Sequence, residues 1–253
     1  MPIDETHTAM NTPKSDYKIW RYMDIPSFLS ILVENALTFT SARLMEDKFE
    51  GTLPKLTKIL DELFIKKITI DYKIKNKLTP FSEIMLMLKD SVYLNCWCKE
   101  KTEMVHMWKI YSKENGIAIE TTYNRLKKAI IDEETIYPTE ISYLDYEKQY
   151  LDCKSNTLTP YTIKRLEYKS EQELRLIISF PNKVKNTTEA SKTITEMNGY
   201  YKKFPVIKIK VDIAKLIEKV HISPFAPMWY TELVKNTLEK FGLGNISVIR
   251  SEL

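Results

Sequence analysis

The hydrophobic pattern at the start of the chain predicts a compact strand–helix–strand unit. The aromatic and apolar run over residues 17–22 is typical of a strand. Asp24 stands two residues before a proline, which is the pattern of a capped helix with an early proline. Apolar residues recur at helical spacing over residues 25–34, Asn35 favours a helix end, and residues 37–41 predict a second strand.

The middle of the chain alternates between helical and strand-like patterns. Residues 53–89 are rich in Leu, Ile and Lys and predict helices that Pro80 divides. Residues 91–98 have the β-branched and aromatic content of a central strand. We expect Thr102 to cap a helix that Asn115 and Gly116 end. Further strands are expected over residues 117–119 and 140–144, with a short helix over 121–131 between them.

The last third of the chain predicts a buried strand and a closing strand–helix–strand unit. Residues 145–165 are polar and partly helical in pattern, residues 171–178 run from a polar entry into a buried strand, and residues 206–211 alternate as a half-exposed strand does. The closing unit is expected over residues 220–222, 227–241 and 246–249. The polar segment 181–198 predicts a mobile surface insertion.

The chain has no internal break in composition. Residues 1–15 are polar and contain two prolines, so we predict a disordered leader there. Residues 16–253 are then expected to form a single α+β domain with a mixed or antiparallel β-sheet core flanked by helices. At 43% hydrophobic residues, the chain can bury a sizeable core.

Composition excludes several kinds of site. With only 5 glycines and neither a GxGxxG nor a GxxxxGK[ST] pattern, a Rossmann fingerprint or a P-loop is not supported. The net charge of +4 fits an anionic ligand but not a strongly basic DNA-binding surface. Cys96, Cys98 and Cys153 form no disulfide framework, and no ligand motif predicts a metal. With no signal peptide or spanning run in the pattern, a cytoplasmic protein without membrane contact is expected.

Two carboxylates enter the strand predicted over residues 171–178. If that strand begins at Glu171, then Glu171, Glu173 and Arg175 share one face, because residues two apart on a strand point the same way. Like charges side by side are unfavourable unless a cation or a hydrogen-bond donor lies between them. A rigid carboxylate pair suits glycosidic chemistry on a ribose. For Glu-Gln-Glu on its own, an ordinary solvated strand entrance is the favoured interpretation.

A stripe of large side chains lies on the helix predicted after Thr102. Met104, Met107, Trp108 and Tyr111 fall at helical spacing. Such a stripe is usually part of a core, so the pattern alone favours packing over ligand binding.

Three separated groups of residues together resemble the DUF2971 family, a bacterial domain of unknown function. The groups keep the family's order and spacing, and the resemblance extends from Trp20 to the C-terminus. They are Trp20-Arg21-Tyr22 with Leu37-Thr38-Phe39-Thr40 and Glu46-Asp47-Lys48-Phe49-Glu50-Gly51; Cys96-Trp97-Cys98 with Met107-Trp108-Lys109-Ile110-Tyr111 and Asn115-Gly116-Ile117-Ala118-Ile119-Glu120; and Tyr168-Lys169-Ser170-Glu171-Gln172-Glu173-Leu174-Arg175.

The chain departs from the family's pattern at three positions. Glu46 and Lys48 stand where the family usually has Asn and Pro, and Ser170 stands where a more apolar residue is common. The resemblance therefore leaves the role of the loop over residues 46–51 open.

The layout of elements is also similar to ADP-ribosyltransferase-type folds, some of which have a split sheet. Those folds bind NAD in a cleft without Gly-rich loops; an early strand supplies Arg or His, a middle element Tyr or Ser with an aromatic residue, and a late strand Glu. The likeness implies NAD as the substrate, with the carboxylates acting on it and the other groups binding it. The implied catalytic residues are Glu173 and Glu171, and the implied NAD-binding residues are Arg21, Tyr22, Trp108 and Tyr111.

The implied function is ADP-ribosyl transfer or NAD cleavage, in a bacterial context such as phage defence or toxicity. Two other classes stay open. The chain can instead be a nucleotide or nucleic-acid binding module in which four aromatic residues stack bases without cleaving a bond, namely Trp20, Tyr22, Trp108 and Tyr111. It can also be a scaffold in which the carboxylates and Arg175 form a structural ion-pair network. The acceptor, whether protein, nucleic acid, small molecule or water, and the oligomeric state are not predicted.

Overall fold

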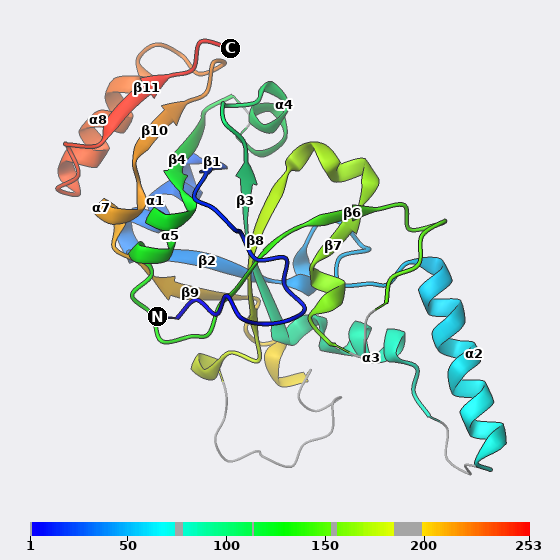
Figure 1. Ribbon diagram of the computed structural model, residues 1–253. Helices are drawn as coiled ribbons and strands as arrows, with labels where there is room; N and C mark the ends of the chain where they lie inside the picture. Colours follow the sequence, from blue (N-terminus) through cyan, green and yellow to red (C-terminus); the bar gives the residue numbers. More distant parts are fainter. Residues whose placement is uncertain (1, 74–77, 113, 153–155, 185–198) are drawn as a thin grey trace.

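A mixed β-sheet forms the centre of the computed structural model, which describes residues 2–73, 78–112, 114–152, 156–184 and 199–253. The described strands of this sheet number nine, and helices pack around it (Figure 1). The sheet runs in the order β11-β10-β4-β1-β3-β2-β9, and β8 extends it by pairing with β3 and β5. The α+β class and the mixed-sheet core predicted from the sequence are therefore confirmed.

The strands of the main sheet are β1 (Lys18–Asp24), β2 (Ala36–Ser41), β3 (Val92–Lys99), β4 (Gly116–Thr122), β5 (Tyr137–Glu140), β8 (Glu173–Ser179), β9 (Val206–Lys210), β10 (Lys219–Ile222) and β11 (Ser247–Arg250). A separate parallel pair is formed by β6 (Ser142–Leu144) and β7 (Ile163–Arg165). The helices are α1 (Ile25–Glu34), α2 (Lys55–Asp71), α3 (Phe81–Leu88), α4 (Val105–Met107), α5 (Tyr123–Ala129), α7 (Ile213–Leu216) and α8 (Tyr230–Lys240).

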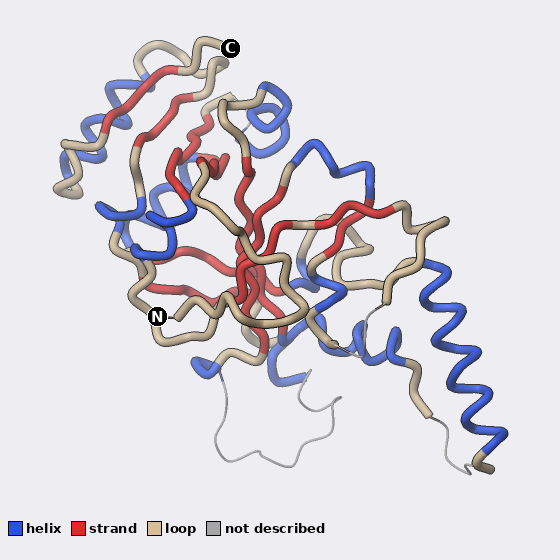
Figure 2. The backbone as a smooth tube through the Cα atoms, in the orientation of Figure 1, coloured by secondary structure: helices blue, strands red, loops and turns tan. Residues whose placement is uncertain are grey.

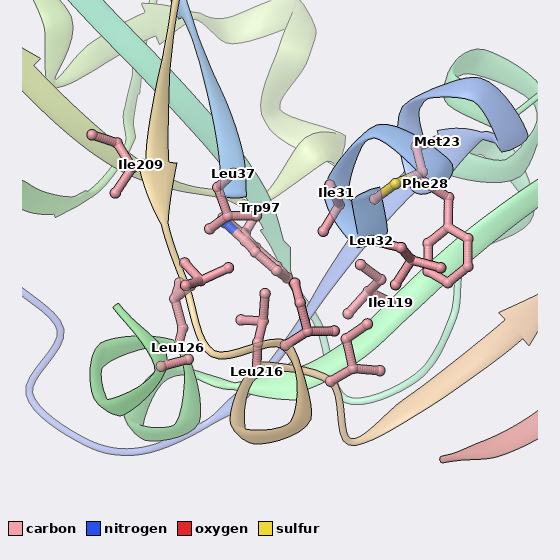
Figure 3. Close-up of a cluster of buried hydrophobic side chains, with 14 of the residues drawn as sticks. Met23, Phe28, Ile31, Leu32, Leu37, Trp97, Ile119, Leu126, Ile209 and Leu216 are labelled. Carbon is pink, nitrogen blue, oxygen red and sulfur yellow. The ribbon is translucent and has the colours of Figure 1, made fainter. Parts of the chain in front are cut away.

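The opening unit forms as its pattern predicts. The Asp24 side chain accepts a hydrogen bond from the Ser27 amide and caps α1, and Asn35 ends the helix in the left-handed conformation. Phe28, Ile31 and Leu32 are the buried side chains of α1. Figure 3 shows this helix packing its apolar side chains toward the sheet, in the cluster that forms the main core.

One edge of β3 is shared by two strands and is open between them. β1 pairs with β3 only through Ile19 and Trp20, although it pairs with β4 along its whole length. β2 pairs with the same edge of β3 through Thr40 and Ser41. Between these ladders, no described strand pairs with the edge near Cys96, whereas β8 pairs with the opposite edge throughout. This gap positions the candidate site.

Two helices extend to one side of the sheet. The sequence predicted helices divided by Pro80, and α2 and α3 confirm this, with Pro80 directly before α3. Figure 1 and Figure 2 show α2 standing away from the sheet at the edge of the molecule. No helix in the described part of the chain combines the length and the apolar character needed to span a bilayer.

Two local predictions in the middle of the chain are wrong. Thr102 does not cap the helix, which begins at Val105 after an extended Met104 and continues as a π-helical turn over Trp108–Ser112. The strand expected over residues 140–144 is divided into β5 and β6, because the chain changes partner there: the Ile141 amide still donates to the carbonyl of Glu173 beside β8, and from Ser142 the chain pairs with β7. Short polar segments gave no periodicity with which to place these boundaries.

The N-terminal residues are held against the domain and are not the disordered leader that their composition predicted. The Asp4 amide donates to the carbonyl of Ile136, and the Ile136 amide donates back to Pro2. Glu5 pairs with Lys127 at 2.9 Å and accepts a hydrogen bond from the Tyr123 hydroxyl. Composition did not reveal this because backbone hydrogen bonds need no apolar side chain. Of the predicted mobile insertion, residues 185–198 lie outside the described residues.

Deleting residues 2–11 should lower the free energy of unfolding by about 2–4 kcal/mol, because several backbone hydrogen bonds worth about 1 kcal/mol each are lost. The bonds at stake join Asp4 to Ile136 and Asn11 to Glu140 and Thr139. Urea unfolding of the full chain and the truncated chain measures the difference. Equal midpoints and slopes would contradict the contacts described above.

Candidate functional site

A cavity of about 200 Å³ lies where the edge of β3 is open. Its walls come from β1, β2, β3, β7, β8 and the turn that follows α4. Of the six residues singled out in the sequence, five line this cavity, namely Arg21, Tyr22, Tyr111, Glu171 and Glu173. Residues from three distant segments of the chain therefore meet at one place.

The guanidinium of Arg21 occupies the gap between β1 and β3. Its Nη1 donates to the carbonyl of Cys96 at 3.5 Å, and its Cζ lies 5.7 Å from the centroid of the Trp97 ring. In the described part of the chain no carboxylate pairs with it, and burial lowers the pKa of Arg21. A cation held without a counter-ion beside a cavity is suited to an anionic ligand.

Arg175 lies behind the cavity wall with no exposed surface and binds two carboxylates. Its Nη1 and Nη2 donate to Oε1 and Oε2 of Glu50 at 2.6 and 3.0 Å. Its Nε and Nη2 donate to Oε1 and Oε2 of Glu173 at 2.6 and 3.1 Å, and Nη1 also reaches the carbonyl of Tyr161. Such paired donors fix both carboxylates in position.

Lys164 of β7 joins the two predicted catalytic carboxylates. Its Nζ donates to Oε2 of Glu171 and lies 3.2 Å from Oε2 of Glu173. The Tyr111 hydroxyl donates to Oε1 of Glu171 at 2.7 Å. Lys164 is the cation that two neighbouring like charges require between them. The sequence does not reveal the role of Lys164, because β7 is a strand of 3 residues within a segment whose pattern is polar and partly helical.

Glu171 lines the cavity but does not lie on the predicted strand. It ends a 3-10 helix over Leu166–Glu171, and Gln172 adopts φ 44° before β8 starts at Glu173. The prediction that one strand face carries both carboxylates is therefore wrong for Glu171. It holds for Glu173 and Arg175, which pair at 2.6 Å.

The charges around Glu173 keep it ionised. Burial alone would raise the pKa of Glu173, but the charges and hydrogen bonds of Arg175 and Lys164 outweigh burial and lower it to about 2. Burial opposes the charge of Lys164 too, yet Glu173 and Glu171 outweigh that effect and raise the pKa of Lys164. Glu173 is thus a fixed anion at neutral pH and not a proton donor.

The loop over residues 46–51 supports the site from behind. Glu50 binds Arg175, and Asp47 accepts two hydrogen bonds from Arg165, which neighbours Lys164 in β7. Gly51 has φ +65° and packs so closely on Tyr161 that a Cβ atom there would lie 2.3 Å from the ring. The loop over residues 46–51 therefore supports β7 and β8, a role that the sequence leaves open.

The aromatic residues predicted to stack on a ligand occupy different places. Tyr22 lines the cavity, and the Trp108 ring packs edge-on against it with centroids 5.0 Å apart. Trp108 has no exposed surface and donates from Nε1 to Glu103, so it supports Tyr22 and does not contact the cavity. Trp20, which the sequence offered only for base stacking, is a further wall residue.

A second hollow of about 520 Å³ continues from the cavity toward the start of α1. Arg21, Tyr22, Thr40 and Tyr111 line both spaces, so the two are adjacent. The hollow also carries polar side chains, namely Asp24, Ser27, Ser30 and Thr38. The combined site therefore has a small inner part with carboxylates and aromatic rings and a larger, hydroxyl-rich outer part.

Comparison of the chain with models of known protein families, with curated proteins and with solved structures gave no match. Within the described residues there is no cluster of three or more His, Cys, Asp or Glu side chains arranged to hold a metal.

The pKa of Glu173 predicts an acid-sensitive stability. Because that pKa is about 2 in the folded state, the carboxylate contributes stability that is present above its unfolded pKa, about 4.3, and is lost as pH falls toward 2. Urea unfolding between pH 6 and pH 3 should show this loss. The Glu173→Gln variant should have a lower free energy of unfolding at pH 6, and that free energy should fall less steeply than the wild type's as the pH is lowered to 3.

The exposed Glu147 provides the matched control, because within the described residues its carboxylate pairs with Lys55 alone, at the surface. Glu147→Gln should leave the slope of stability against pH unchanged. A Glu173→Gln slope equal to that of the wild type would show that Glu173 is not held at a lowered pKa.

Proposed function

We propose that the cavity binds NAD and cleaves its nicotinamide–ribose bond, passing ADP-ribose to an acceptor or to water. The observation that carries this proposal is the meeting of Arg21, Tyr111, Glu171 and Glu173 at the gap in the ladder of β3. The gap between β1 and β3 also agrees with the split sheet of ADP-ribosyltransferase-type folds, to which the layout of this chain is similar. The resemblance to the DUF2971 family names no activity, so the proposal rests on the site.

The polarity of the cavity suits the charge pattern of NAD. On the inner wall Glu171 and Glu173 face one cation, Lys164, while the charges of Arg175 and Glu50 behind the wall offset each other. The inner wall is therefore net negative, and the Arg21 cation lies at the gap that leads to the outer hollow. NAD carries a positive nicotinamide ring and a negative pyrophosphate, so the ring suits the inner part and the pyrophosphate suits Arg21.

The sizes of the two spaces agree with this orientation. The inner cavity, about 200 Å³, takes a nicotinamide ring and part of its ribose, with Tyr22 and Trp20 as aromatic walls. The outer hollow of about 520 Å³ takes the remaining nucleotide against Ser27, Ser30 and Thr38. The hydroxyl groups of Ser27 and Thr38 can donate to phosphate or ribose oxygens, whereas the Ser30 hydroxyl donates to Glu34.

The proposed reaction breaks the bond between the ribose anomeric carbon and the nicotinamide nitrogen. The nicotinamide leaves as a neutral molecule with the electron pair of that bond, and the ribose becomes an oxocarbenium-like cation. The fixed negative charge of Glu173 stabilises this cation or orients a ribose hydroxyl. An acceptor hydroxyl, amine or water then attacks the anomeric carbon, and Glu171 takes the proton that the acceptor loses.

Two other functions account for part of the same geometry. Full burial of Arg175 between Glu50 and Glu173 favours a structural ion-pair network. A base-stacking module is favoured less, because Trp20, Tyr22 and Trp108 are buried against one another and offer no open platform. The structural alternative is the one that an experiment must separate from catalysis.

Glu173→Gln should reduce NAD cleavage by about 100-fold or more, the usual effect of removing a group that stabilises developing charge. The measurement is release of nicotinamide from NAD, with radiolabelled adenylate followed in a cell extract that supplies protein and nucleic-acid acceptors. An intact NAD pool after incubation with folded wild-type protein would refute the proposed activity.

Glu50→Gln is the matched control. Like Glu173, Glu50 pairs with Arg175, but it does not line the cavity. Both substitutions should lower the midpoint of thermal unfolding. Glu50→Gln should keep the rate of NAD cleavage within about tenfold of the wild type, a much smaller loss than the one expected when a group that stabilises the transition state is removed. Parallel losses of stability and activity in both variants would assign Glu173 to the structural network.

Lys164→Gln should move the acid limb of the rate of NAD cleavage to higher pH. Lys164 is one of the two cations that lower the pKa of Glu173, so its removal raises that pKa. Lys164→Arg keeps the charge and should restore the wild-type limb. Initial rates of nicotinamide release between pH 4 and pH 8 make the comparison. A limb due to Glu173 lies below this range in the wild type and should enter it only in Lys164→Gln, so identical profiles in all three proteins would exclude Glu173 as the group that titrates.

A further inference from the structure

The outer hollow is lined by one cation and one carboxylate. Among the described residues that line it, Arg21 is the cation, Asp24 is the carboxylate, and the others are uncharged. Arg21 lies on the side of the inner cavity, because it lines both spaces, whereas Asp24 lines the outer hollow and not the inner cavity. The hollow therefore has one end that attracts an anion and another end that repels one.

The start of α1 lines the outer hollow but offers little to a phosphate group. A helix N-terminus usually binds phosphate through its free amide groups. Here Pro26 has no amide hydrogen, and the Ser27 amide already donates to Oδ1 of Asp24 at 2.9 Å. The carboxylate of Asp24 also places negative charge at the position where a phosphate would bind. The start of α1 consequently opposes an anion instead of attracting one.

Asp24 retains an acceptor for a ligand. Its Oδ1 accepts the hydrogen bond of the helix cap, and among the described residues its Oδ2 has no hydrogen-bond partner. The side chain is exposed and borders the hollow. A carboxylate oxygen accepts strong hydrogen bonds from hydroxyl groups, and the hydroxyls of a ribose are donors of this kind.

A second cation, Lys208, lies near the hollow, but its charge is already offset. Its Nζ donates to Oγ of Ser30 and to Oγ1 of Thr38, both at 2.9 Å. The same Nζ pairs with Oε1 of Glu34 at 3.0 Å. Lys208 is not among the residues that line the hollow, and its contacts orient the two hydroxyls that do. Among the described residues, no lining cation at the Asp24 end is therefore left for a further phosphate.

We propose that Asp24 makes the site selective for a dinucleotide whose adenosine ribose carries free hydroxyls, so that NAD is bound and NADP is rejected. This inference rests on the proposed function, because it takes the orientation given there, with nicotinamide in the inner cavity and the pyrophosphate at Arg21. Asp24 follows Arg21 by three residues in β1, which is about 10 Å of extended chain. That span is comparable with the distance from the pyrophosphate to the ribose hydroxyls of an adenosine diphosphate group.

A 2′-phosphate differs from a 2′-hydroxyl in charge and in hydrogen bonding. It adds a charge of about −1.5 to −2 at neutral pH. Beside Asp24 this charge meets a carboxylate of the same sign, and a fully ionised phosphate has no hydrogen to donate to Oδ2. The wild type should therefore bind ADP-ribose about tenfold or more tightly than ADP-ribose 2′-phosphate.

Isothermal titration calorimetry with these two ligands measures the preference without any turnover. Asp24→Asn and Asp24→Ser both remove the charge, and because Asn and Ser are good N-caps, α1 should be retained. In both variants the 2′-phosphate should bind more tightly than it does to the wild type, and the preference for ADP-ribose should fall to about threefold or less.

Salt provides a second readout that a steric effect would not give. Raising NaCl from about 50 to 500 mM should reduce the preference of the wild type, because salt screens the charge of an exposed carboxylate. The preference of Asp24→Asn and Asp24→Ser should respond much less, since the charge that salt screens is absent.

Asp212→Asn is the matched control, because it makes the same substitution at another helix cap. Asp212 caps α7 by accepting a hydrogen bond from the Lys215 amide, and it lines neither the inner cavity nor the outer hollow. This variant should bind both ligands with wild-type affinity. The circular dichroism spectra of all three variants should match that of the wild type.

The outcomes separate this inference from the proposed function. Equal or tighter binding of the 2′-phosphate by the wild type would overturn the selectivity, and so would an unchanged preference in Asp24→Asn and Asp24→Ser; the proposed cleavage would stand in both cases. Binding of neither ligand would overturn the inference together with the proposed function. A preference for ADP-ribose that both substitutions abolish, in a protein that leaves NAD intact, would support the inference and refute the cleavage.

Discussion

The buried charge of Arg175 is the constraint on which the arrangement of the site depends. A guanidinium without solvent is tolerated only where counter-charges and hydrogen bonds surround it. Glu50 and Glu173 supply the charges, and the Tyr161 carbonyl supplies a further acceptor. The loop that carries Glu50 must therefore close over β8, and the tight contact of Gly51 with Tyr161 shows how closely it does so.

The ion pair between Arg175 and Glu173 also fixes one wall of the cavity, the wall that carries Glu173. Arg175 and Lys164 together hold Glu173 in one orientation and keep it ionised. Lys164 then reaches Glu171, and the Tyr111 hydroxyl completes the set from the turn after α4. Under the proposed function, the same contacts therefore provide both structural ion pairing and preparation for catalysis. A carboxylate already fixed by its partners needs no reorganisation when charge develops next to it.

Patterns that depend on neighbouring residues were readable in the sequence. The capped helix after Asp24, the break at Pro80 and the pairing of Glu173 with Arg175 all involve residues within a few positions of each other. The meeting of Glu50 with Arg175 depends on how distant segments pack, and the bridge from Lys164 depends on how the chain turns between β7 and β8. No local spacing encodes those contacts, although a like-charge pair does require some cation between its members.

The wrong predictions for Glu171 and for the N-terminal residues also arise from contacts that local patterns do not encode. Glu171 shares a strand face with Glu173 only if the strand begins at Glu171, yet Gln172 adopts a left-handed conformation that sets Glu171 on a separate turn. The N-terminal residues lack apolar periodicity, but their backbone bonds to Ile136 and their Glu5 side chain hold them in place. Composition describes what side chains can bury, and it does not describe which backbone groups find partners.

The opening in the ladder of β3 separates the positive part of the site from its negative part. If β1 continued to pair beyond Trp20, the backbone of β3 near Cys96 would be covered and Arg21 would have no gap to occupy. With the gap, a cation lies toward the outer hollow and two carboxylates lie at the inner wall. During the proposed cleavage, positive charge moves from the nicotinamide ring to the ribose, because the ring departs neutral while the anomeric carbon becomes electron-poor. An anion fixed near the ribose favours that transfer more than it favours the bound substrate, and this difference is what accelerates a reaction.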